Sequence, residues 1–162
     1  MKKAVAVRPS DLRALFTFLL PAFMLICLPA GGQGETDVII TPEKGDRSFV
    51  LASGGRCAPL CVSPEEWPGV KRALTDLQND LGRVTGTIPG LITAAKAPRS
   101  EFVIIAGTIG KSALIDRLIK KDKIDVGTII GRWESYVILT VEKPFPGVKN
   151  ALVIAGSDKR GT

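Results

Sequence analysis

Residues 156–162, with the sequence GSDKRGT, place four polar or charged side chains between glycines, directly after an apolar stretch. In α/β proteins, ligands often bind at loops that follow the carboxyl ends of strands. Lys159 and Arg160 could donate hydrogen bonds to an anionic group, and Ser157 could add a hydroxyl donor. The alternative is an ordinary loop, in which Asp158 caps a following helix or pairs with a neighbouring base.

Two other stretches have residue types that could bind a ligand. Residues 105–112 (IAGTIGKS) end like a phosphate-binding loop, but Ile105 stands where that motif needs its first glycine. We therefore predict a tight turn between a strand and a helix. Trp133 and Tyr136 could form a platform for a sugar ring. A single Trp at the start of a strand is more often packed, and we predict that Trp133 is packed.

The sequence offers few groups for acid–base or metal chemistry. It contains no His, which excludes Ser-His-Asp and Cys-His nucleophile systems and His-containing zinc sites. Asp76 and Asp80 lie one helical turn apart, but on the polar face of a predicted amphipathic helix, and Glu65 and Glu66 are merely adjacent. We assign no catalytic residue, no cofactor and no metal.

Cys57 and Cys61 form a CAPLC motif. In an oxidising compartment they could form a local disulfide, with Pro59 helping the tight bend, or remain two free buried thiols. The sequence leaves both alternatives open. A metal site is not expected, because two thiolates would need further ligands and no His is present.

The elements that must position these residues follow from periodicity. Alternating or continuous apolar runs predict strands over 37–41, 48–52, 101–106, 135–141 and 150–155. A helix begins at Ser63, by a capping box with Glu66, or at Pro68, and ends at Gly82 or Gly86. A second helix covers 111–121, and a loop covers 54–61. The order β-β-α-β-α-β-β predicts an α/β (α+β) fold, a mixed β-sheet with helices packed on its faces. The residues expected to face inward are Val70, Ala73, Leu74, Leu77 and Leu81 in the first helix, and Ala113, Leu114, Ile115 and Leu118 in the second.

Residues 1–34 read as a secretory signal peptide: a basic start, an uncharged run over 14–30, and small residues at Ala30, Gly31, Gly32 and Gly34. A retained membrane anchor and a lipoprotein anchored at Cys27 are the alternatives. The formal net charge of +6 divides equally, because residues 1–34 and 35–162 each carry +3. We therefore expect a secreted or periplasmic domain over 35–162, without a stable membrane anchor and without nucleic acid as a partner.

Four stretches together resemble one enzyme family in order and spacing. They are residues 80–86 (DLGRVTG), 103–112 (VIIAGTIGKS), 131–135 (GRWES) and 151–162 (ALVIAGSDKRGT). They are similar to the N-terminal domain of glycoside hydrolase family 115, the xylan α-1,2-glucuronidases. The resemblance covers about residues 37–162, and the CAPLC motif is not part of it.

The resemblance implies an N-terminal fragment of a larger enzyme. In that family the domain precedes a (β/α)8 barrel that carries the catalytic carboxylates and removes glucuronic acid, or its 4-O-methyl ether, from xylan with inversion. The fragment would be inactive alone, and glucuronoxylan or xylo-oligosaccharides would be bound through the barrel. Ser157, Lys159 and Arg160 would then contact the uronate. The alternative is a stand-alone exported carbohydrate-binding or structural α/β domain.

Overall fold

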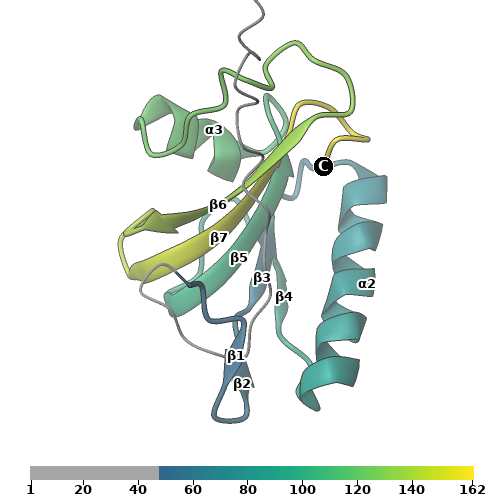
Figure 1. Cartoon of the computed structure of the whole chain (residues 1–162), viewed down its shortest axis with the longest axis vertical. Helices are drawn as coiled ribbons and strands as arrows, with labels where there is room; N and C mark the ends of the chain where they lie inside the picture. Colours follow the sequence, from purple (N-terminus) through teal and green to yellow (C-terminus); the bar gives the residue numbers. More distant parts are fainter. Residues whose placement is uncertain (1–47) are drawn as a thin grey trace, which may run out of the picture. The chain divides into compact units, whose positions relative to one another are not determined.

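The computed structural model describes residues 48–162 (Figure 1). The predicted signal peptide and the strand expected over 37–41 lie outside these residues. Within the described part, no helix has the length and apolar character needed to cross a membrane.

The elements of residues 48–162 follow one another as β-β-β-α-β-β-α-β-β. Their bounds are β1 Ala52–Ser53, β2 Arg56–Cys57, β3 Leu60–Val62, α2 Pro68–Thr85, β4 Leu91–Thr93, β5 Ser100–Thr108, α3 Ala113–Lys120, β6 Tyr136–Glu142 and β7 Val148–Gly156. The predicted fold class is confirmed, because these elements form a mixed sheet with helices on its faces.

Five strands form the main sheet in the order β4-β3-β5-β7-β6, and β1 and β2 form a separate antiparallel pair. β3, β4, β5 and β7 run parallel, whereas β6 is antiparallel to β7. The carboxyl ends of the four parallel strands therefore meet at one edge. The first residue of β6, Tyr136, pairs with Gly156 at this same edge. We call it the carboxyl edge.

The two helices cover opposite faces of the sheet (Figure 1). Leu74 of α2 packs with Leu60 and Ile104, whereas Leu118 of α3 packs with Ile105 on the other face. β5 is apolar at successive positions because both of its faces are covered. Burying a side chain such as Leu118 contributes about 1.5–3 kcal/mol.

The ends of α2 follow from local chemistry. Pro68 occupies the first turn, where a missing N–H costs nothing, and Gly86 adopts the left-handed conformation with its N–H bonded to the carbonyl of Gly82. The start at Pro68 is confirmed, and the capping box is wrong. The Glu66 side chain reaches across the sheet edge instead of back to Ser63.

Three further expectations are corrected. The loop expected over 54–61 contains β2 and most of β3, which lies inside the sheet between β4 and β5. Only Ala52 of the strand expected over 48–52 is in a strand, and β4 was missed. Ala73 and Ala113 are exposed rather than inward-facing. Strands of two or three residues are too short to show a hydrophobic period.

Candidate functional site

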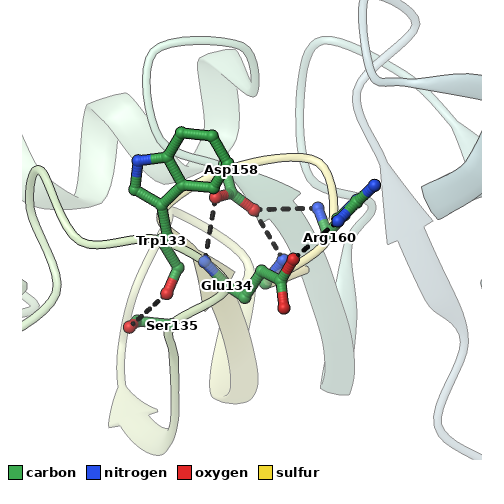
Figure 2. Close-up of polar contacts among 6 residues, drawn as sticks. Trp133, Glu134, Ser135, Asp158 and Arg160 are labelled. Atoms are coloured by element: carbon green, nitrogen blue, oxygen red, sulfur yellow. Dashed lines mark hydrogen bonds and ion pairs between the residues drawn. The ribbon is translucent and has the colours of Figure 1, made fainter.

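Asp158 organises the loop that follows β7 (Figure 2). Its Oδ1 accepts hydrogen bonds from the backbone N–H of Arg160 at 2.9 Å and of Gly161 at 2.8 Å. Its Oδ2 accepts the N–H of Glu134 at 2.9 Å. These three donors, with the N–H of Glu134 the strongest influence, hold the pKa of the Asp158 carboxyl below its usual value. Asp158 therefore closes a turn and ties it to the loop before β6.

The three predicted binding residues lie together on this loop. The Arg160 guanidinium contacts the Glu134 carboxylate at 2.8 Å (Figure 2), and both side chains are largely exposed, so the pair contributes less than about 1 kcal/mol. Lys159 is exposed. Ser157 pairs with Ser135, because its N–H donates to the Ser135 carbonyl and its Oγ accepts the Ser135 N–H.

Aromatic side chains gather at the same edge. The chain has two Trp and one Tyr, and the exposed fractions of Trp133, Tyr136 and Trp67 are 84%, 60% and 39%. The prediction that Trp133 is packed is wrong. Gly131 and Glu134 take left-handed conformations on either side of it, and polar contacts rather than apolar burial hold its loop. The carboxyl edge thus presents aromatic rings beside Lys159 and Arg160.

Glu66 is a residue that sequence reasoning missed. Its side chain is almost fully buried, and both carboxylate oxygens accept hydrogen bonds. Oε2 accepts the N–H of Thr108 at 2.8 Å, and Oε1 accepts the Thr108 hydroxyl at 2.8 Å and the N–H of Trp67 at 3.0 Å. The Thr108 hydroxyl also lies 2.8 Å from the Thr162 hydroxyl, which in turn donates to the Asp158 carbonyl at 3.0 Å. This hydrogen-bonded chain joins the β3–α2 loop, β5 and Thr162.

The turn between β5 and α3 is tight, as predicted. Gly110 is left-handed, and the N–H groups of Lys111 and Ser112 both donate to the carbonyl of Thr108. The Lys111 ammonium lies 4.6 Å from the centre of the Trp67 ring, a cation–π contact. This contact connects the turn to the aromatic side chains at the carboxyl edge.

Two buried hydroxyls lie beside this turn. Ser63 and Ser112 are fully buried, and among the described residues their Oγ atoms alone are buried without a hydrogen-bond partner. Ser112 is the N-cap residue of α3, yet its side chain does not cap the helix. An unsatisfied buried hydroxyl costs about 1–3 kcal/mol, so this pair is an unusual feature.

Both cysteines of the CAPLC motif are free thiols, so the disulfide alternative is not found. Cys61 is buried among the side chains on the α3 face of the sheet, and burial raises the pKa of its thiol to about 11. Cys57 is half-buried and contacts the Thr85 hydroxyl and the Thr87 carbonyl beyond the end of α2. Cys61 thus belongs to the five-stranded sheet, whereas Cys57 belongs to the separate β1–β2 pair.

The paired carboxylates of α2 lie on a solvated face, as predicted. Asp76 pairs with Arg72 and Asp80 with Arg83, and all four side chains are more than half exposed. Across residues 48–162, no group of three or more Cys, Asp or Glu side chains is arranged to hold a metal ion.

A shallow hollow of about 390 Å³ lies at the opposite edge of the sheet. It is lined by Lys121, Lys123, Lys143 and the β6–β7 turn. Lys121 and Lys123 come just after α3 and are exposed. The aromatic side chains and the Ser157–Arg160 loop lie at the carboxyl edge instead.

No protein-family model matches the chain, and no curated protein matches it. The resemblance to glycoside hydrolase family 115 therefore rests on its four motifs. In the structure, the motifs over 103–112, 131–135 and 151–162 all reach the carboxyl edge, whereas residues 80–86 form the far end of α2.

Proposed function

We propose that this chain is the N-terminal α/β domain of an exported glycoside hydrolase that removes glucuronic acid, or its 4-O-methyl ether, from xylan side chains. The domain is non-catalytic by itself, and its carboxyl edge contributes to binding the acidic sugar. The observation that carries the proposal is the meeting of three distant sequence motifs at this one edge.

The chemistry of the edge supports a sugar acid as its ligand. Exposed aromatic rings can stack on the apolar faces of sugar rings, and Trp133 has no apolar packing that would otherwise explain its position. Arg160 and Lys159 can donate charge-assisted hydrogen bonds to a carboxylate. The hydrogen bonds of Asp158 hold the backbones of the two loops in place before any ligand binds, which lowers the entropic cost of binding.

The hydrogen bonds and ion pair made by the carboxylates near these rings support a binding role for the domain rather than a catalytic one. Inversion at a glycosidic bond needs two carboxyl groups about 6.5–9.5 Å apart, one free to give a proton and one to activate water. Glu66 and Asp158 instead accept hydrogen bonds from backbone N–H groups, and Glu134 forms an ion pair with Arg160. The catalytic pair would come from the barrel domain.

The test is isothermal titration of the chain with glucuronic acid and with xylo-oligosaccharides that carry it. We expect binding that weakens at least tenfold in Arg160→Ala and in Trp133→Ala. Arg72→Ala is the matched control, because Arg72 is an equally exposed arginine in an ion pair on α2. Absence of binding, or equal loss in the control, would contradict the proposal. The chain should release no glucuronic acid from glucuronoxylan.

A stand-alone exported carbohydrate-binding domain is the second candidate, and the exposure of Trp133 favours it equally. The coding sequence beyond Thr162 separates the two. An in-frame continuation into a barrel supports the glycosidase domain, whereas a stop codon supports the independent binding domain.

A further inference from the structure

The sheet changes its direction of winding between β3 and β5. From β3 the chain continues through α2 to β4 on one side, and from β5 through α3 to β6 and β7 on the other (Figure 1). In open α/β sheets this point, beyond the carboxyl ends of the two strands, is where a ligand-binding crevice forms. Here it is flanked by Ser63 after β3 and by Thr108 at the end of β5.

In this chain a side chain fills the crevice. The Glu66 carboxylate accepts the N–H and hydroxyl of Thr108 and the N–H of Trp67, the arrangement that a bound carboxylate ion would adopt. No Lys or Arg contributes an ion pair to Glu66 among the described residues, so these three hydrogen bonds alone replace its hydration.

The unpartnered hydroxyls lie at the same place. A Cβ added at Gly107 would lie 2.4 Å from the Ser112 Oγ and 3.1 Å from the Glu66 Oε2, so Ser112 and Glu66 meet over this glycine. Ser63 follows Val62, the register partner of Ala106, and therefore lies beside Gly107 from the neighbouring strand. One buried hydroxyl without a partner, that of Ser112, thus lies close to a Glu66 oxygen, and the other, that of Ser63, belongs to the adjacent position of the neighbouring strand.

We propose that the crevice is a carboxylate-binding pocket, formed by Ser63, Trp67, Thr108 and Ser112 around Gly107, and that Glu66 is its built-in occupant. The pocket has more donors than one side chain satisfies. Removal of the Glu66 side chain beyond Cβ leaves space for acetate, which has the same atoms as the part removed.

This occupancy gives Glu66 a positioning role. It fixes the backbone of Trp67 directly, and through Thr108 and Thr162 it reaches the loop that carries Lys159 and Arg160. The effect of Glu66 on sugar binding rests on the proposed function, whereas the pocket itself does not. Acetate binding is therefore measured without any sugar present.

The test uses thermal unfolding of the full chain as wild type, Glu66→Ala and Glu66→Gln. Acetate at about 100 mM, compared with an equal concentration of chloride, should raise the Tm of Glu66→Ala by roughly 3–6 °C if its Kd is about 10 mM. The wild type and Glu66→Gln should not respond, because their pockets are filled. Pivalate, which has the same charge but more bulk, should have no effect on Glu66→Ala.

The outcomes are distinct. No acetate response in Glu66→Ala, or an equal response in the wild type, overturns the proposal. If Glu66→Ala does not fold in chloride, recovery of its native circular dichroism on addition of acetate supports the pocket, and failure to recover overturns it. Binding of acetate without any sugar binding would refute the proposed function and leave the pocket intact.

Discussion

The backbone N–H of Glu134 donates to Oδ2 of Asp158 at 2.9 Å, although 24 residues separate the two. This bond joins the loop that carries Trp133 to the loop that carries Arg160 (Figure 2). Polar contacts therefore hold together the backbones of two loops, one with an exposed aromatic ring and one with an exposed cation. Side chains on loops with fixed backbones have less freedom to lose when a ligand binds.

The first prediction concerns the acid sensitivity of this connection. The pKa of Asp158 is lower in the folded chain than the value of about 3.9 that the unfolded chain would have. Its stabilising contribution is therefore fully present above that value and is lost as pH falls through the lower, folded pKa. Hydrogen exchange measured by NMR should show the Glu134 and Gly161 amides losing protection there. Asp158→Ala, which has no side-chain acceptor, should lack protection even at neutral pH, and unchanged protection in this variant would refute the role of the carboxylate.

The second prediction concerns the exposure of the two tryptophans. In a Trp67→Phe variant, the fluorescence of Trp133 should resemble that of indole in water and be strongly quenched by acrylamide. In Trp133→Phe, the remaining Trp67 should be quenched less, because Lys111 lies over its ring. Trp133→Ala should change the free energy of unfolding by less than about 0.5 kcal/mol, since the side chain is exposed. A blue-shifted, protected Trp133 would restore the packed interpretation.

The long elements could be predicted because their patterns are strong. β5 carries an unbroken apolar run covered on both faces, and β6 and β7 coincide closely with the strands predicted over 135–141 and 150–155. β3 could not be found in this way. Its three residues, Leu60–Val62, form a strand because β4 and β5 pair with them on both sides. That pairing depends on the tertiary fold and leaves no pattern in the local sequence.

The same contrast between local pattern and tertiary contact applies to the residues of the candidate site. Ser157, Lys159 and Arg160 could be singled out because charged residues between glycines follow an apolar strand, and their role in binding stays a prediction. Glu66 had no such pattern. Its partner Thr108 is 42 residues away, so its burial becomes visible only when β3 and β5 are side by side. Trp133 was misjudged because residue type alone does not report exposure.

The third prediction concerns the thiols, in variants that each keep one cysteine. With only Cys57 present (Cys27→Ser, Cys61→Ala), the native chain should react with a thiol reagent at mildly alkaline pH. With only Cys61 present (Cys27→Ser, Cys57→Ser), it should react only after unfolding, because burial raises the pKa of Cys61 to about 11 and the thiolate is the reactive form. Rapid native labelling of Cys61 would show that β3 is not in the core.

The last prediction concerns the close contact at Gly107. A Cβ at this position would lie 2.4 Å from both the Cβ and the Oγ of Ser112, and the neighbours belong to a turn closed by its own hydrogen bonds. Gly107→Ala should therefore lower the free energy of unfolding by about 1–3 kcal/mol, the usual cost of overpacking, measured by urea titration. Gly69→Ala is the matched control, because nothing lies within 4 Å of its added Cβ and its helical position favours alanine by up to about 1 kcal/mol. A Gly107→Ala chain as stable as the control would mean that Ser112 and Glu66 do not meet over this glycine.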